Sequence, residues 1–272
     1  MGKMKYIIIT KKMMVITVFA VFAVVVAMCV SAAVLPEMTA NADGKKLPIY
    51  CAPSDKKTVS LSFDAAWGNE DTEQLISILK QYNVKATFFV VGEWVDKYPE
   101  SVKALSDAGH EIMNHSNTHP DMIKLSKTEM AEEINACNDK IEKITGKRPT
   151  LFRAPYGSYN NTLIEVLEEM GMHCIQWDVD SLDWKDYTAD KIYNRVTEKV
   201  QNGSICLFHN AAKHTPEALG DIIEKLQADG YTLLPISENI YKGEFTLDHE
   251  GRQVPKQTGA VSTTSTKIKT TK

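Results

Sequence analysis

The stretch HEIMNHSNTH, residues 110–119, joins a short strand-like segment to two histidines. His110 to Asn114 has the length and composition of a β-strand. His115 and His119 follow at a spacing of four, and two imidazoles at this spacing can meet one divalent cation if the backbone between them makes a helical turn. Such a pair alone is weak evidence, because two histidines on a turn without a metal are common.

The same order, an apolar run followed by polar side chains, recurs along the chain from Thr58. Short β-rich runs alternate with longer amphipathic ones, which predicts parallel strands with covering helices. The expected strands are 58–63, 86–91, 110–114, 150–153, 172–177, 204–208 and 232–234. The expected helices are 71–82, 126–144, 161–170, 187–200 and 216–229. An open doubly wound sheet and a closed barrel both fit this alternation. No glycine-rich loop follows the first strand, which counts against a nucleotide-binding fold.

Two of the expected helices carry terminal signals. Ser126, with Glu129 three positions later, has the form of a capping box, and Gly146 suits the left-handed position that ends a helix. Pro216 and Gly230 mark the start and the end of the last expected helix.

The N-terminal segment has the pattern of an export signal or a membrane anchor. Lysines precede an apolar run from Met13 to Val30 that continues to Leu35. This length is close to the roughly 20 residues that cross a bilayer, but a small-x-small site also permits cleavage after Ala42. Both outcomes stay open for residues 1–42. The flanking lysines favour a cytoplasmic N-terminus, which places the rest of the chain outside the cytoplasm.

The remaining residues form one well-patterned block. We expect a linker over 43–57, a single domain over 58–245 and a disordered tail over 246–272, where Ser, Thr and Lys show no apolar periodicity. The formal net charge is only −4 with the two signs interspersed, which argues against a nucleic-acid surface. We expect a monomer with a neutral partner. The five cysteines lack metal-finger spacing and suit a buried core, although an exported protein could pair two of them.

Polar side chains lie at or just past the ends of the expected strands. In barrels of parallel strands the working residues lie at the carboxyl ends of the strands, so we expect these side chains to meet at one end of the sheet. They are Asp64, His115, Arg153, Asp178, Asp180 and His209.

These residues fall within five ordered motifs. The motifs are Phe63-Asp64, His115-Ser116-x-x-His119, Arg153-Ala154-Pro155-Tyr156-Gly157, Asp180-x-x-Asp183-Trp184 and Leu207-x-His209. Over about Thr58 to Tyr241 the chain resembles the polysaccharide deacetylases with the NodB homology domain, carbohydrate esterase family 4. The Phe-Asp-x-x-Trp-Gly form of the first motif is most similar to the spore-associated branch typified by PdaB. The resemblance implies a distorted (β/α) barrel of seven or eight strands.

The resemblance also implies a metal centre and a base. His115 and His119 would hold a divalent ion, with zinc expected first because it prefers imidazole ligands. Asp64 would take a proton from water, and Arg153 would keep it ionised and oriented. The alternative for Asp64 is a strand-end carboxylate that caps the next helix.

An acid and a substrate wall follow from the same resemblance. His209 would protonate the departing amine, and Asp183 would favour its imidazolium form. Trp184 and Leu207 would enclose the acetyl methyl group, and a backbone N–H near Tyr156 would stabilise the oxyanion. The alternatives are a structural histidine and two core side chains.

One position departs from the family pattern. Active members carry a second aspartate after the first as a third metal ligand, and here that position is Ala65. Two imidazoles are one ligand short of the usual catalytic zinc set. Glu70 or Asp71 could complete the site, water or substrate could complete it in a weak enzyme, or the cleft could only bind glycan. The acid and base residues are all present, so we expect retained deacetylation of extracytoplasmic glycan. Peptidoglycan of the wall or spore cortex is the expected substrate, with chitin-like oligomers as the alternative. A silent glycan-binding or sporulation morphogenetic protein is the competing hypothesis.

Overall fold

Short strands alternate with amphipathic helices through residues 44–256, the part of the chain that the computed structural model describes. The strands of the main sheet are β1 (Thr58–Ala65), β2 (Thr87–Val90), β3 (Glu111–Asn114), β4 (Leu151–Phe152), β5 (His173–Cys174), β6 (Val179–Asp180), β7 (Ser204–His209) and β8 (Thr232–Leu233). The helices are α2 (Thr72–Gln81), α3 (Gly92–Lys97), α4 (Pro99–Asp107), α5 (Lys127–Thr145), α6 (Asn161–Glu169), α7 (Ala189–Thr197), α8 (Thr215–Ala228) and α9 (Ile236–Asn239). A short antiparallel hairpin, β9 (Phe245–Leu247) and β10 (Gln253–Pro255), follows them.

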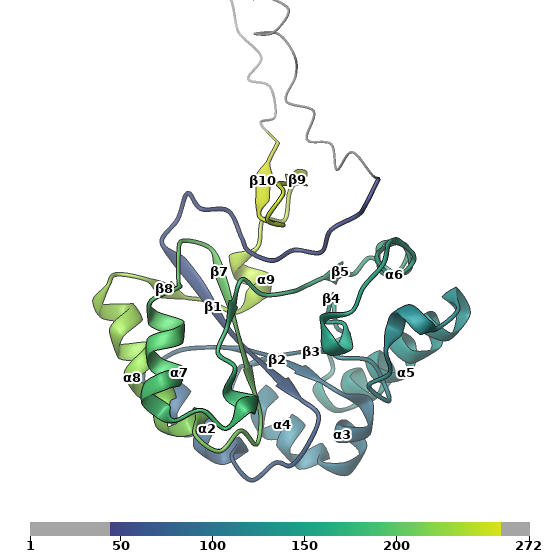
Figure 1. Ribbon diagram of the computed structural model, residues 1–272. Coiled ribbons are helices and arrows are strands. Elements are labelled where there is room, and N and C mark those ends of the chain that lie inside the picture. Colours follow the sequence, from purple (N-terminus) through teal and green to yellow (C-terminus); the bar gives the residue numbers. More distant parts are fainter. Residues whose placement is uncertain (1–43, 257–272) are drawn as a thin grey trace, which may run out of the picture. The chain divides into compact units, whose positions relative to one another are not determined.

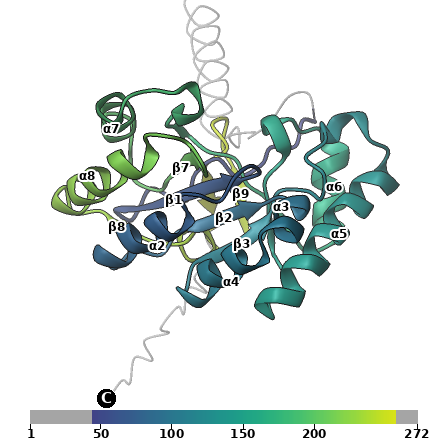
Figure 2. The same cartoon turned by 90° about the horizontal axis from the view of Figure 1, so that it is seen from below.

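The sheet is parallel and curled, with the strand order β5-β4-β3-β2-β1-β7-β6. Strand β8 pairs with the first two residues of β1, outside this path. Helices α7 and α8 lie beside one half of the sheet, and α5 and α6 lie beside the other (Figures 1 and 2). This is the distorted β/α barrel architecture that the resemblance implied, with seven strands in its continuous path.

Residues before β1 also belong to the sheet. Ile49 forms a parallel bridge to Ile175, next to β5, and Cys51 bridges Ser204 at the start of β7. Ordered structure is therefore present within the predicted linker, 43–57, and the β9–β10 hairpin lies largely within the predicted disordered tail, 246–272. The predicted signal or anchor, residues 1–42, lies outside the described residues.

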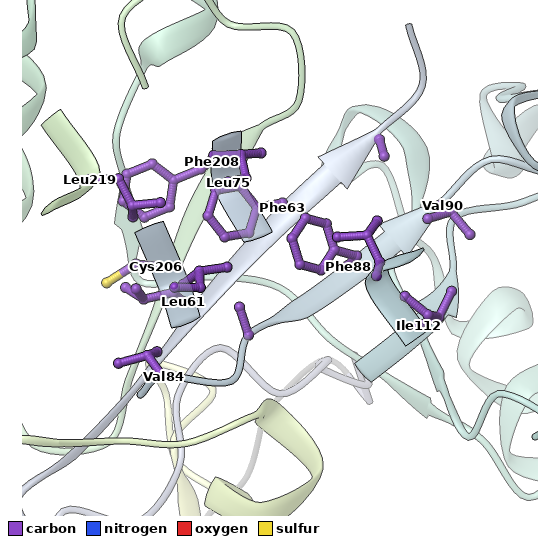
Figure 3. Close-up of a cluster of buried hydrophobic side chains, with 14 of the residues drawn as sticks. Leu61, Phe63, Leu75, Val84, Phe88, Val90, Ile112, Cys206, Phe208 and Leu219 are labelled. Atoms are coloured by element: carbon purple, nitrogen blue, oxygen red, sulfur yellow. The ribbon is translucent and has the colours of Figure 1, made fainter. Parts of the chain in front are cut away.

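Strand β1 shows how the core is divided between the two faces of the sheet. Its odd-numbered residues from Val59 to Ala65 pack in the cluster under the helices, whereas Ser60, Ser62 and Asp64 point to the other face. Phe63 stacks between Phe88 and Phe208, with ring centroids 4.8 and 5.4 Å away (Figure 3). Both faces of the central strand are therefore buried, as a parallel sheet requires.

Each expected strand and helix has a counterpart, with boundaries that differ by a few residues. The capping box at Ser126 and Glu129 and the left-handed Gly146 are confirmed at the two ends of α5. Helices α3 and α4 and the two-residue strand β6 were not predicted. The four cysteines in the described part of the chain are buried and free. Within residues 44–256, no helix combines the length and apolarity needed to span a membrane.

Candidate active site

A cavity of about 780 Å³ opens at the carboxyl ends of the strands. Most of the predicted site residues line it, namely Asp64, His115, His119, Tyr156, Asp180, Asp183, Trp184, Leu207 and His209. Arg153 is fully buried and does not line the cavity. Asp178 was expected at this end of the sheet, but its carboxylate accepts from the Ser204 hydroxyl and the Ile205 N–H at the start of β7, so that expectation is wrong. The parallel register explains the convergence, because Asp64 at the end of β1 pairs with His209 at the end of β7.

The carboxylate of Asp64 is paired with a fully buried arginine. Arg153 Nη1 donates to Asp64 Oδ1 at 2.7 Å, and Nη2 donates to the carbonyl of Gln176 at 3.2 Å. The guanidinium carbon lies 4.1 Å from the centre of the Phe89 ring. Burial is the largest single influence and would raise the pKa of Asp64, but the charge and hydrogen bond of Arg153, together with the nearby His115 and His209, outweigh it and hold the pKa below its usual range. Asp64 is therefore ionised and fixed in orientation.

His115 presents an unprotonated nitrogen to the cavity. Its Nδ1 lies 2.8 Å from the carbonyl oxygen of Arg153, which can only accept, so Nδ1 carries the proton. Nε2 then keeps its lone pair and lies 3.5 Å from Asp64 Oδ2. Burial lowers the pKa of His115, and it lowers the pKa of His119 to about 4. Both imidazoles are neutral near pH 7, the form that binds metals.

The backbone between these two histidines is not the helical turn that the spacing suggested. Ser116 and His119 both adopt left-handed conformations, with φ of 67° and 59°. The Ser116 hydroxyl accepts from the His119 N–H at 3.0 Å. Glu133 of α5 accepts from the N–H groups of Asn117 and Thr118 at 2.8 and 2.9 Å. The turn still brings the two rings together, with centroids 5.0 Å apart.

His209, at the end of β7, is hydrogen-bonded to the buried carboxylate of Asp183. Asp183 Oδ1 lies 2.7 Å from His209 Nδ1, and Oδ2 accepts from the His209 N–H at 2.8 Å and from the Thr215 hydroxyl at 2.7 Å. Burial alone would lower the pKa of His209, but the hydrogen bond and charge of Asp183 outweigh it and raise that pKa. The pair therefore has the form of a protonated acid held by its partner.

In the described part of the chain, His115 and His119 have no third protein ligand beside them. Ala65 continues β1 in register with Val90, so its side chain lies in the cluster under the helices and not in the cavity. Within the described residues, no group of three or more His, Cys, Asp or Glu side chains is arranged to hold a metal ion. The two imidazoles suit a divalent ion only if water or substrate supplies the other ligands.

The carboxylates suggested as replacements point elsewhere, which corrects that expectation. Asp71 Oδ2 accepts from the N–H of Ala211 at 2.8 Å, and Glu70 accepts from the N–H of Asn69 at 2.9 Å. Neither carboxylate lines the cavity. Both are engaged by nearby main chain, as short acidic side chains at a helix start commonly are.

The substrate-wall residues differ in exposure. Leu207 is buried at the cavity floor, whereas Trp184 and Tyr156 are exposed at its edge, which argues against Trp184 as a core residue. Tyr156 has a left-handed φ of 60°. Sequence reasoning assigned no role to Trp67 and Asn210, which also line the cavity, although Trp67 comes three positions after Asp64 and Asn210 directly follows His209.

Known proteins resemble this chain in sequence and in structure. A family model described as polysaccharide deacetylase matches residues 52–175. The peptidoglycan-N-acetylmuramic acid deacetylase PdaA of Bacillus subtilis is 32% identical over 202 residues, covering 73% of this chain and 77% of that protein. The chain belongs to the polysaccharide deacetylase family. This polysaccharide deacetylase homologue is also 37% identical to the uncharacterized protein YlxY of Bacillus subtilis, over 70% of this chain and 60% of YlxY. It matches the deacetylase PdaC at 39% identity but spans only 39% of that protein.

Solved structures share the fold of this polysaccharide deacetylase homologue. BA3943 of Bacillus anthracis, described as a CE4 family pseudoenzyme, is 37% identical with a TM-score of 0.70, covering 72% of this chain and 69% of that one. A BA3943 mutant described as having restored enzymatic activity gives 38% identity and the same TM-score, covering 72% of each chain. The Bc1960 peptidoglycan N-acetylglucosamine deacetylase is 32% identical with a TM-score of 0.69, covering 71% of this chain and 92% of that one.

Proposed function

We propose that the protein is a metal-dependent hydrolase that removes N-acetyl groups from extracytoplasmic glycan, with peptidoglycan of the wall or spore cortex as its substrate. The observation that carries this proposal is that a carboxylate paired with a buried arginine and a histidine paired with a buried carboxylate line one cavity with two neutral imidazoles. Relatives named as peptidoglycan deacetylases support the substrate class.

The two proton transfers of the reaction fall to two charged pairs, Asp64 with Arg153 and His209 with Asp183. His115 and His119 would hold the ion, which when bound polarises the acetyl carbonyl and activates water. Asp64 accepts the proton of the attacking water, because Arg153 keeps the carboxylate ionised in a buried place. His209 donates a proton to the departing amine.

Asp183 and the exposed aromatic edge support the acid and the substrate. Asp183 favours the return of a proton to His209 after each transfer, because its negatively charged carboxylate stays hydrogen-bonded to Nδ1. Trp184 and Leu207 would enclose the acetyl methyl group, and the main chain at Tyr156 would contact the oxyanion. A place in the spore-associated branch stays a prediction from the first motif.

A second candidate is a protein that binds the same glycan without hydrolysing it. Ala65 favours it, because the side chain at this position lies among apolar neighbours and offers no ligand. The likeness to BA3943, a chain described as a pseudoenzyme, points the same way.

Acetate release from N-acetylated peptidoglycan separates the two candidates. We expect the zinc-supplied parent to release acetate and Asp64→Asn to release it roughly 10²–10⁴-fold more slowly. Ala65→Asp is the matched variant that adds a possible metal ligand. We expect it to bind zinc at least roughly 10–100-fold more tightly, which is the effect of changing groups that only contact the metal ligands. In the parent the side chain at position 65 points away from the cavity, so the new carboxylate can reach the cavity only if β1 ends one residue earlier. Release by Ala65→Asp but not by the parent would overturn the first proposal in favour of the second.

A further inference from the structure

Exposed aromatic side chains gather at the cavity. Within residues 44–256, six large hydrophobic side chains are exposed, and three of them line this one opening. These three are Trp67, Tyr156 and Trp184, which are 60%, 72% and 59% exposed. Exposed apolar surface concentrated at a concave site marks a place where a ligand covers it.

The main chain that carries Trp67 is held tightly. The carbonyl of Trp67 accepts from Trp94 Nε1 at 2.9 Å and from Asn210 Nδ2 at 2.6 Å. The carbonyl of Gly68 accepts from the same two groups at 2.6 and 2.7 Å. Asn210 Oδ1 also accepts from the N–H of Ala66 at 3.2 Å. The loop is thus fixed by its backbone on both sides of Trp67, while the indole is left outside.

The indole stands next to the metal-binding side of the cavity. Its ring centroid lies 6.0 Å from that of His119 at an interplanar angle of 64°, and the ring of Tyr156 lies 4.8 Å from His119. A contact of this kind covers at most one face of the indole, and the side chain is largely exposed. Trp67 therefore presents a flat apolar surface beside the place where the reacting acetyl group would enter.

We propose that Trp67 is a sugar-binding platform, on which a pyranose ring of the acetylated glycan stacks next to the acetyl group in the cavity. The inference rests on the proposed function for the identity of the ligand, but it does not require hydrolysis. One face of a β-linked pyranose carries only C–H groups, and its hydroxyls project from the ring edge into water. An indole offers a large contact area to such a face and loses little side-chain freedom. The backbone bonds from Asn210 and Trp94 fix the platform before the glycan arrives, which reduces the entropy lost on binding.

The test is calorimetric titration with a β-1,4-linked N-acetylglucosamine tetrasaccharide and, separately, with soluble peptidoglycan fragments. The titrations contain a chelator, so that no turnover occurs. We expect Trp67→Ala and Trp67→Leu to weaken binding about tenfold, the order expected for the loss of one aromatic contact. Trp67→Phe, which keeps a flat ring, should stay within about threefold of the parent. Tyr241→Ala is the matched control, because this aromatic side chain is 37% exposed and lies outside the cavity.

Three outcomes would overturn the platform. They are parent-like affinity in Trp67→Ala, equal affinities in the Leu and Phe variants, and no binding of either glycan by the parent. The variants keep the loop, because every hydrogen bond at residue 67 uses its main-chain carbonyl. Acetate release is measured separately. A parent that binds glycan through Trp67 but releases no acetate would refute the hydrolase and leave the platform standing.

Discussion

Arg153→Met tests whether charge holds the buried pair at the end of β1. Arg153 is fully buried and Asp64 nearly so, and Nη1 lies 2.7 Å from Oδ1. Removing one partner of such a pair leaves a buried, uncompensated charge, which costs about 3–5 kcal/mol of unfolding free energy. For a domain of this size that corresponds to a fall in melting temperature of roughly 6–20 °C. Arg148→Met is the matched control, because Arg148 pairs with Asp139 and Glu142 at the surface and should cost less than about 1 kcal/mol.

The pH dependence of the loss identifies its cause. In the parent, the lowered pKa of Asp64 contributes stability above the ordinary carboxyl pKa, and this contribution disappears as pH falls through the folded pKa. In Arg153→Met, burial instead raises the pKa of Asp64, so protonation relieves the charge and the deficit shrinks as pH falls. Thermal unfolding in a chelator at pH 5 and pH 8 measures the change in the deficit, because the contribution of Asp64 to the parent is fully present at both values. A pH-independent loss, or one no larger than that of Arg148→Met, would refute this account. The double variant Asp64→Asn, Arg153→Met should recover most of the stability.

Three further predictions concern the cavity. Replacing His115 and His119 together by Ala should abolish zinc binding in calorimetric titration, and an unchanged affinity would contradict the placement of the ion between them. Asp64→Asn and His209→Ala should each lower acetate release roughly 10²–10⁴-fold while glycan still binds, and release near the parent rate in either would show that the base or the acid is wrongly assigned. Asp183→Asn removes the negative charge beside His209 and leaves only a neutral acceptor for Nδ1, so the pKa of His209 falls and the alkaline limb of the pH–rate profile, where the acid loses its proton, should move to lower pH. A limb that does not move would mean that another group sets it.

The strand pattern and the residues after each strand could be predicted because both follow from local sequence. Asp64 and Arg153 are 89 positions apart, yet both follow strand candidates, and parallel strands bring their carboxyl ends to one edge. Strand β6, by contrast, has two residues and no periodicity to detect. Helix α3 has only six residues, too few for a full amphipathic repeat, and one residue separates it from Pro99 at the start of α4.

The details of the site depended on contacts that no local pattern encodes. The left-handed Ser116 and His119 carry no glycine signal, and their turn is stabilised by Glu133 from a distant helix. Asp71 was a reasonable third ligand from its position, but the N–H of Ala211, 140 residues away, occupies it. Tertiary hydrogen bonds therefore decided which acidic side chains reach the cavity.

The bridges made by Ile49 and Cys51 determine how many N-terminal residues can be removed before the chain begins to aggregate. Ile49 donates to the carbonyl of Cys174 at 2.9 Å and accepts from the N–H of Gln176 at 2.7 Å. A chain cut at Pro53 would leave these main-chain groups beside β5 without their partners. An uncovered strand edge is a template on which a second chain can pair. A shortened chain that begins at Pro48 keeps the cover in place, so it should remain dispersed where the one that begins at Pro53 self-associates.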